Sequence, residues 1–205
     1  MPATGSARPS PRPRLVLASA SPRRLDLLVQ IGIVPDEVVG ADVDERARRR
    51  ELPAAFVHRL ADVKAEAVAA LRPGALVLAA DTVVACGRRI LPKPKDAAEA
   101  RRYLTLLSGR RHRVVGAVCL IGSDGRPRRR LVTTVVQFKR LSQAEVDAYV
   151  AGDEWSDKAG AYAIQGRAAA FVRRIVGSYS NVVGLPLYET VALLEGAGYA
   201  IRGAR

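Results

Sequence analysis

Hydrophobic residues along this chain occur in short continuous runs that alternate with stretches of helical spacing. The pattern predicts a strand at 14–19, a helix at 22–31 and a short strand near 37–41. A longer helix is predicted from Pro53 to about residue 72. We expect the apolar stripe of this helix to consist of Phe56, Val57, Leu60, Val63, Ala67 and Leu71.

Hairpins and helices share the rest of the chain. Asp96 with Glu99, and Ser142 with Glu145, have the spacing with which a side chain caps the start of a helix. Strands are predicted at 75–80, continuing into a hairpin-like turn near Gly87 and back through Ile90, and at 114–121, 131–138, 172–176 and 199–202. Helices are predicted at 96–107, after Ser142 and at 186–194. Because some strands are joined directly and others through helices, we expect an α/β fold with a mixed, twisted sheet.

No repeat or linker divides the chain, so residues 14–205 are expected to form a single domain. Residues 1–13 are rich in Pro, Arg and Ser and are predicted to be a mobile tail. The apolar run at 15–18 is shorter than the ~7–15 residues of a signal-peptide core, and no membrane span is expected. Cys86 and Cys119 lack the spacing of a metal site or a disulfide framework, which favours a cytoplasmic location.

The net charge of +13 comes mainly from arginine, since only five of the 33 basic residues are lysines. The arginines are scattered among the tail and the runs at 46–50, 110–113 and 126–130. None of these runs is interleaved with the aromatic residues that base stacking requires, which argues against a nucleic-acid partner. A basic surface speeds the arrival of any polyanion, a nucleoside triphosphate included. The charge therefore indicates an anionic partner without identifying it.

The segment 15–28, which reads LVLASASPRRLDLL, joins a buried strand to a helix through a short polar turn. Ser21 suits the N-cap and Pro22 the first helical position. Free backbone N–H groups at a helix start attract anions, and Arg23 and Arg24 would add charge-assisted bonds to phosphate oxygens. The same pattern also fits a capped helix with two solvated arginines.

Several polar residues stand where structure alone does not require them. Asp81 follows the apolar strand LVLAA, at the kind of position where α/β sheets bind ligands, so it is a candidate general base or metal ligand. Lys64 lies on the apolar stripe of the long helix, and Lys93 stands between two prolines. Either lysine suits a phosphate site. As alternatives, Lys64 fits a side chain that simply extends to solvent from the edge of the core, and Lys93 fits an ordinary loop lysine.

Two further features remain open. Glu45 belongs to an acidic cluster with Asp42 and Asp44, which suits water-mediated Mg²⁺ binding or simply balances the basic run that follows. Gln165 lies in a segment of small residues, and its amide presents the paired donor and acceptor that can recognise a base edge. Such segments, including the glycine-bounded loop at 177–186, also fit ordinary turn chemistry.

Taken in order, the motifs resemble those of the Maf family of nucleoside triphosphate pyrophosphatases, from about Leu15 to Tyr199. They read S-x-S-P-R-R, a helix lysine, A-D-T, K-P, S-G-x-x-H, D-K-A-G-A-Y-x-I-Q-G and G-S-Y-S-N-V-V-G-L-P. The resemblance implies an elongated, two-lobed Maf/ITPase-like fold with a central cleft, often as a homodimer. It also implies hydrolysis between the α and β phosphates with a divalent metal such as Mg²⁺, Mn²⁺ or Co²⁺.

The resemblance also assigns roles by motif. Asp81 would accept the proton of the attacking water and, with Glu45, hold the metal. The remaining residues that would bind substrate are Ser19, Arg23, Arg24, Lys64, Thr82, Lys93 and Gln165.

At three positions the chain resembles the branch of the family that acts on dTTP and UTP. Arg23, Thr82 and Gln165 follow this pattern, whereas the 7-methyl-GTP branch tends to carry tryptophan, glutamine and glutamate. Gly116 and Trp155 depart from relatives, which often have threonine and proline there. The rival hypothesis is a non-catalytic protein that binds nucleic acid or a division partner, since the family's name refers to septum formation. A purely binding role, however, does not require the whole polar set.

Overall fold

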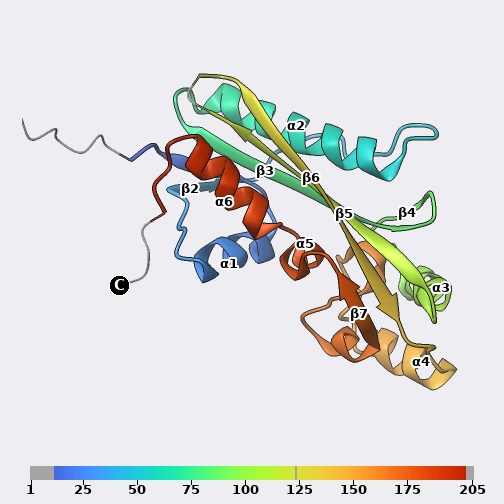
Figure 1. Cartoon of the computed structure of the whole chain (residues 1–205). Helices are drawn as coiled ribbons and strands as arrows, with labels where there is room; N and C mark the ends of the chain where they lie inside the picture. Colours follow the sequence, from blue (N-terminus) through green and yellow to red (C-terminus); the bar gives the residue numbers. More distant parts are fainter. Residues whose placement is uncertain (1–11, 123, 202–205) are drawn as a thin grey trace, which may run out of the picture.

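A seven-stranded mixed sheet runs through the molecule, with helices on both of its faces (Figure 1). This computed structural model describes residues 12–122 and 124–201. The strands are β1 (Leu15–Ala18), β2 (Glu37–Val39), β3 (Leu76–Cys86), β4 (Arg89–Leu91), β5 (Arg111–Ile121), β6 (Pro127–Phe138) and β7 (Val172–Val176). The α-helices are α1 (Pro22–Gln30), α2 (Pro53–Leu71), α3 (Ala97–Leu107), α4 (Gln143–Ala151), α5 (Tyr179–Val183) and α6 (Leu187–Gly196), and the short 3₁₀ helices are η1 (Ala159–Ala161) and η2 (Arg167–Phe171).

The strand order is β2-β1-β3-β5-β6-β7, with β4 paired to β3. β1 pairs in parallel with β2 and β3, and the other pairs are antiparallel. The prediction of an α/β fold with a mixed sheet is therefore confirmed.

One edge of β3 has two different partners. β1 pairs with residues 76–79, and β4 pairs with residues 84–86 on the same edge. Residues 80–83 lie between these two partners, so this part of the edge faces a gap in the sheet. β5 pairs with the opposite edge of β3 throughout this region, so β3 stays hydrogen-bonded on that side across the gap.

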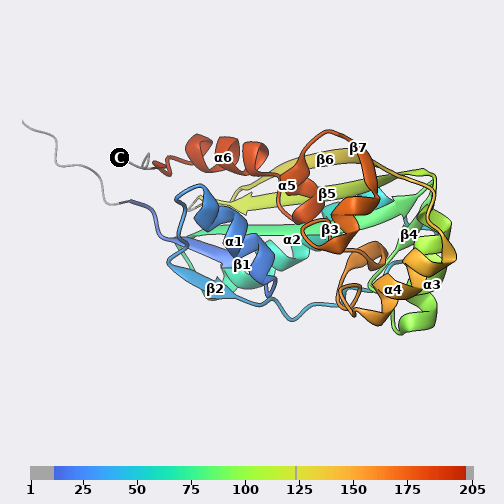
Figure 2. The same cartoon turned by 90° about the horizontal axis from the view of Figure 1, so that it is seen from below.

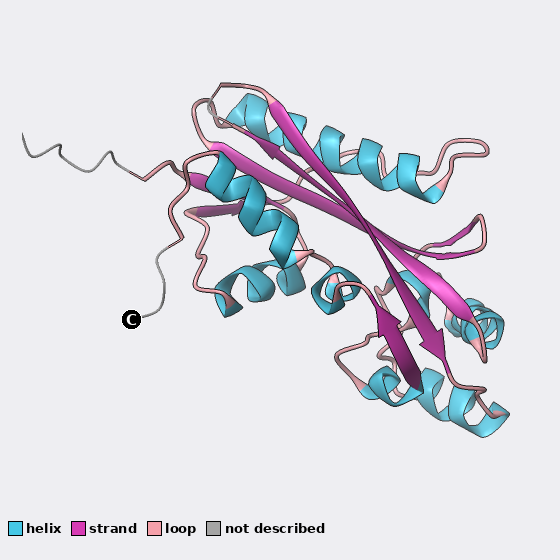
Figure 3. Cartoon of the chain, viewed as in Figure 1, coloured by secondary structure: helices cyan, strands magenta, loops and turns pink. Residues whose placement is uncertain are grey.

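The two faces of the sheet carry different layers. α2 packs alone on one face, against β3 and β5, through a core that includes Val77, Ala79 and Val83. Leu78, Ala80 and Val84 point to the other face, because successive strand residues alternate. That second face is covered by α1, α5 and α6 at one end and by α3 and α4 at the other (Figures 2 and 3).

β5 and β6 extend along the length of the molecule and connect its two ends (Figure 1). One lobe contains β1, β2, α1 and α6, and the other contains β7, α3 and α4. This arrangement matches the elongated, two-lobed form that we expected. None of the helices within the described ranges is long and apolar enough to cross a membrane.

The buried stripe of α2 differs from the predicted one. Val63 is 36% exposed and Leu71 is 64% exposed, whereas Ala61, Ala65 and Val68 are buried. Alanine and valine are so frequent in this helix that its sequence contains two overlapping apolar stripes. The helix presents the stripe with more alanines to the sheet, because small residues let the two backbones approach closely.

Three local predictions also need correction. Asp81 lies within β3 rather than at the end of a strand, because β5 pairs with β3 beyond the end of β1, while the predicted hairpin near Gly87 forms between β3 and β4. No strand forms at 199–201, where Tyr199 is buried without strand pairing, and residue 202 lies outside the described residues. The loop at 177–186 contains the helix α5. Residues 1–11 of the expected tail also lie outside the described residues, and Arg12 contacts Asp36.

Candidate active site

A cavity of about 580 Å³ lies beside the gap in the edge of β3. This volume is within the ~300–1,000 Å³ typical of small-molecule sites. All of the predicted site residues line it, although they come from six separate segments: Ser19, Arg23, Arg24, Glu45, Lys64, Asp81, Thr82, Lys93 and Gln165. The fold thus brings the whole predicted set together.

The turn between β1 and α1 holds one arginine firmly. Ser19 is buried, and its Oγ accepts hydrogen bonds from Arg24 Nη1 (3.1 Å) and from the Ser21 backbone N–H (3.2 Å). Arg24 Nε also donates to the Gly184 carbonyl at 2.9 Å. Ser21 occupies the N-cap position as predicted, but its side chain makes no capping bond. Ser19, rather than Ser21, therefore orders this turn.

A lysine joins two carboxylates on the α2 side of the sheet. Lys64 Nζ lies 2.8 Å from Asp81 Oδ1 and 2.6 Å from Glu45 Oε1. Lys64 and Asp81 are each only 7% exposed, so the lysine does not extend to solvent. Lys64 comes from the buried stripe of α2, and Glu45 comes from the loop that precedes this helix. The cluster joins three segments that are far apart in the sequence.

Burial and charge act in opposite directions on Asp81. Burial raises the pKa of this carboxyl above its ordinary value, while the positive charges of Lys64 and Arg24 lower it. Burial also lowers the pKa of Arg24, although a guanidinium remains charged near neutral pH. A raised pKa brings a carboxylate closer to the basicity that suits a general base.

The donor set fits a hard divalent cation. Oxygens of Asp81 and Glu45 converge on one positive charge, the Lys64 ammonium, so two carboxylates already meet where a cation is stabilised. Mg²⁺ is commonly held by one or two carboxylates together with substrate phosphates and water. No group of three or more His, Cys, Asp or Glu side chains within residues 12–122 and 124–201 is placed to hold a metal. Substrate oxygens would therefore have to complete the coordination.

Thr82 lies on the opposite face of β3 from Asp81. Its Oγ1 donates to the Gly184 carbonyl at 3.2 Å, so Thr82 and Arg24 share one acceptor. Asn181 anchors the helix that precedes this carbonyl, because its Nδ2 donates to Val114 O (3.2 Å) and Thr134 Oγ1 (3.1 Å). The segment 178–184 thus fixes one wall of the cavity.

Gly116, one of the two departures from relatives, has a structural reason. It lies directly opposite Thr82 in the β3–β5 pair. A Cβ at this position would lie 2.0 Å from Asn181 Oδ1, so the close approach of the amide requires glycine. The Asn181 oxygen is buried without a hydrogen-bond partner among the described residues.

Charged residues surround the entrance of the cavity. Lys93 Nζ pairs with Asp157 Oδ1 at 2.5 Å, and this contact lowers the pKa of Asp157. Lys158 also lines the cavity, and its pKa is lowered by burial and by the nearby charge of Arg23. Gln165 is exposed here.

The sequence did not assign functions to Asp157, Lys158, Asn181 or Gly184. The motifs that contain them were recognisable, but the contacts that these residues make depend on tertiary structure.

His112 lies behind the cavity wall. Its Nε2 is 2.9 Å from the hydroxyl of Tyr162, a cavity residue, and its ring packs edge-to-face against Phe138 and Tyr162. Burial lowers the pKa of His112 to about 4. The histidine is therefore neutral near pH 7 and supports the wall rather than binding an anion.

Comparison with known proteins extends this description. The family model described as "Maf-like protein" matches residues 14–197. A "dTTP/UTP pyrophosphatase" of Paramagnetospirillum magneticum is 66% identical over 186 residues, which cover 91% of this chain and 98% of the relative. A protein of the same name from Rhodospirillum rubrum is 63% identical over 185 residues, 90% of this chain and 88% of the relative.

One solved structure supports the fold. The Ham1 protein of Staphylococcus aureus matches with a TM-score of 0.52 and 18% sequence identity. The match covers 89% of this chain and 98% of the Ham1 chain. At this identity the similarity extends to the fold alone.

Proposed function

Since this chain belongs to the family of Maf-like proteins, we propose that it is a nucleoside triphosphate pyrophosphatase that hydrolyses dTTP and UTP. The products are the nucleoside monophosphate and pyrophosphate. The observation that carries the proposal is the meeting of Asp81, Lys64 and Glu45 with Ser19 and Arg24 in one cavity. A buried carboxylate beside several cations suits the activation of water next to a polyphosphate.

Asp81 accepts a proton from the water that attacks the α-phosphorus. Lys64, which bonds to Asp81 directly, keeps the carboxylate ionised despite its burial. Arg24 is held in place by Ser19 and Gly184, so it meets the growing negative charge without reorganisation. Lys93 and Arg23 add positive charge at the entrance, where the polyphosphate enters.

The Asp81 and Glu45 carboxylates would hold the divalent metal that the family resemblance implies, Mg²⁺, Mn²⁺ or Co²⁺. When bound, such a metal lowers the pKa of water and neutralises phosphate charge. Lys64 then balances the remaining charge of the two carboxylates. No nucleophilic side chain is required, because water is the attacking group.

Pyrimidine selection is assigned to Arg23, Thr82 and Gln165. The Gln165 amide can pair with the adjacent O4 and N3–H of thymine or uracil, and its side chain is exposed at the cavity entrance. Modified pyrimidine nucleotides carry the same two groups and fall within the same proposal.

Pyrophosphate release from a panel of triphosphates, with and without Mg²⁺, Mn²⁺ or Co²⁺, tests the proposed function. We expect dTTP and UTP to be hydrolysed faster than purine triphosphates, and only with metal present. A preference for 7-methyl-GTP would overturn the assignment of the branch. No pyrophosphate from any nucleotide would favour the rival, a non-catalytic binding protein.

The proposal extends to a cytoplasmic enzyme and to a homodimer. The first is expected from the cysteine content and the second from the family resemblance. Sedimentation of the purified protein at several concentrations distinguishes a dimer from a monomer.

A further inference from the structure

Three arginines lie side by side on an exposed part of the sheet. Arg111 of β5 is paired with Gln137 of β6, and Gln137 is paired with Arg174 of β7. Paired residues of antiparallel strands point to the same face, and Arg113 lies two residues after Arg111 on that face. Arg111, Arg113 and Arg174 are all exposed. We call Arg111, Arg113, Gln137 and Arg174 the arginine face.

This face continues the one on which α2 packs. Val115, Ala117, Cys119 and Ile121 of β5 have the same alternation and are buried under α2. Arg111 and Arg113 precede these residues in β5 and are exposed rather than buried under α2. Because the arginines stand on paired strands, the spacing of their backbone positions is fixed before any partner binds.

The spacing can be estimated from sheet geometry. Arg111 and Arg113 are about 7 Å apart along the strand, and Arg111 and Arg174 are about 10 Å apart across two strand spacings. The face therefore offers a regular array of positive groups rather than a single anion site.

These arginines lack acidic partners. No ion pair within the described ranges involves Arg111, Arg113 or Arg174, although Arg101 and Lys139 in the same lobe pair with Asp147 and Glu145. Arg113 donates only to the Gly87 carbonyl, at 2.6 Å.

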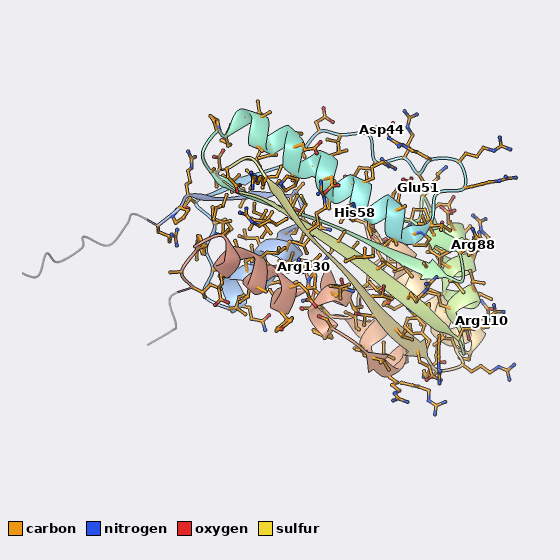
Figure 4. The ribbon with its side chains drawn as sticks, turned by 45° about the horizontal axis from the view of Figure 1, so that its top comes forward. Asp44, Glu51, His58, Arg88, Arg110 and Arg130 are labelled. Carbon is orange, nitrogen blue, oxygen red and sulfur yellow. The ribbon has the colours of Figure 1, made fainter. Side chains whose placement is uncertain are left out.

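Further arginines lie at the same end of the molecule. Figure 4 shows Arg88 and Arg110 at this end of the molecule, with their side chains directed outward. Arg140 lies beside Gly109, next to Arg110 in the chain. The positive charge therefore continues beyond the sheet.

We propose that the arginine face binds the phosphate backbone of double-stranded nucleic acid. Guanidinium groups and amides such as that of Gln137 are the usual donors to phosphate oxygens. The other exposed or half-buried residues of the face, Thr133, Val135 and Val176, include no aromatic side chain on which unpaired bases could stack. The arginine face therefore suits binding to a duplex through its phosphates, independently of the base sequence. This binding is separate from the cavity and does not depend on the proposed hydrolysis.

Fluorescence anisotropy with a labelled random-sequence DNA duplex of about 20 base pairs tests the proposal, at salt concentrations from 50 to 200 mM. The test variant is Arg111→Gln/Arg113→Gln/Arg174→Gln. The matched control removes the same charge from exposed arginines elsewhere, as Arg48→Gln/Arg49→Gln/Arg126→Gln. Hydrolysis of dTTP within about twofold of wild type, or an unchanged circular dichroism spectrum and melting temperature, shows that each variant is folded.

We expect the test variant to bind at least about tenfold more weakly at 50 mM salt. The slope of log affinity against log salt should fall by about two to three, one for each lost phosphate contact. The control should change the affinity by less than about threefold. Equal weakening in both variants would overturn the proposal in favour of diffuse net charge, and an absence of wild-type binding at 50 mM salt would overturn it outright. Binding to vesicles with anionic lipid that the test variant loses, without any DNA binding, would assign the face to a membrane surface instead.

Discussion

The chemistry of the site depends on the way in which a few charged side chains limit one another. Lys64 contacts both Asp81 and Glu45, so none of the three is free to move independently. Arg24 is limited in the same way by Ser19 and Gly184. Charged groups that are fixed before substrate arrives need little reorganisation in the transition state.

Replacement of Asp81 by asparagine should abolish most of the activity. The amide keeps the size of the side chain but cannot accept the proton, so kcat should fall by a factor of about 10²–10⁴. Nucleotide binding should persist, and steady-state kinetics with dTTP separates the two effects. The exposed Asp26→Asn change on α1 is the control and should leave kcat unchanged. Turnover close to wild type in Asp81→Asn would remove this residue from its role.

His112 should make the protein less stable in acid. Its pKa is about 4 in the folded state and about 6.5 when unfolded, so between these values only the unfolded chain takes up the proton. As the pH falls from 7 to 4, this difference favours unfolding by about 3 kcal/mol. Urea unfolding at several pH values measures the loss.

The His112→Gln variant should lose less stability over the same pH range. His58, the other histidine of the chain, is partly exposed on α2, and His58→Gln serves as the matched control. If the unfolding free energy of the wild type and of His112→Gln depended equally on pH, the interpretation of His112 as buried and neutral would be wrong.

At the scale of single residues, the sequence selected groups that the fold places around one cavity, but not what they contact. The nine residues selected from the motifs and their order are all among those that line the cavity. The ion pair of Lys64 with Asp81 joins residues 17 positions apart. The hydrogen bonds of Thr82 and Arg24 to the Gly184 carbonyl join residues at least 102 positions apart. Such contacts follow from strand register and helix orientation, which no local pattern records.

Among the elements, the fit between β5 and α5 is the most demanding. Gly116 and Asn181 approach so closely that an added methyl group has no room. The Gly116→Ala variant should therefore lose about 1–3 kcal/mol of unfolding free energy, the usual effect of overpacking. It should also raise KM, because displacement of α5 moves the Gly184 carbonyl away from Arg24 and Thr82.

Gly196→Ala at the end of α6 provides the control, since nothing lies within 4 Å of a Cβ placed there. This change should be neutral or stabilise the protein by up to about 1 kcal/mol. Denaturant unfolding and dTTP kinetics of both variants test the pair. Equal stability of Gly116→Ala and Gly196→Ala would show that Asn181 moves aside without cost.

The elements themselves were predicted unevenly. α1, α3 and β7 begin and end close to the predicted residues, and α4 begins after Ser142 as predicted. Caps and prolines mark the starts of these helices. The predicted hairpin near Gly87 forms between β3 and β4, but Asp81 was expected at the end of the strand and lies inside it, because a polar residue resembles a strand end when the pairing partner is unknown. The expected strand at 199–202 was wrong within the described residues, because Tyr199 is buried there without strand pairing.

For the whole molecule, a ligand that touches both lobes should stabilise the fold. A non-hydrolysable dTTP analogue at 100 times its Kd adds about 2.7 kcal/mol, which raises Tm by about 5–10 °C for a chain of this length. Lys93→Ala removes a cation at the cavity entrance and should reduce the shift by half or more. Lys95→Ala, an exposed lysine two residues further on, should not. Thermal melts with and without the analogue and Mg²⁺ test this, and an equal shift in both variants would place Lys93 outside the binding region.

The sequence predicted the overall positive charge but not where on the folded molecule the arginines gather. Along the chain the arginines appear scattered, and this argued against a nucleic-acid partner. In the folded molecule, β5 and β7 bring Arg111, Arg113 and Arg174 to one surface through their pairing with β6. Composition gave the sign of the charge, whereas sheet register decides where it is concentrated.

The alternation of side chains along β3 sends adjacent residues to different surroundings. Asp81 points towards α2 and Lys64, where proton transfer is proposed, while Thr82, the next residue, points towards α5 and shares the Gly184 carbonyl with Arg24. A lineage that exchanges one nucleobase for another by replacing Thr82 therefore leaves the Lys64–Asp81–Glu45 cluster in place but must keep Arg24 anchored. Engineers who wish to redirect the enzyme to an unnatural pyrimidine can vary Thr82 under the same constraint.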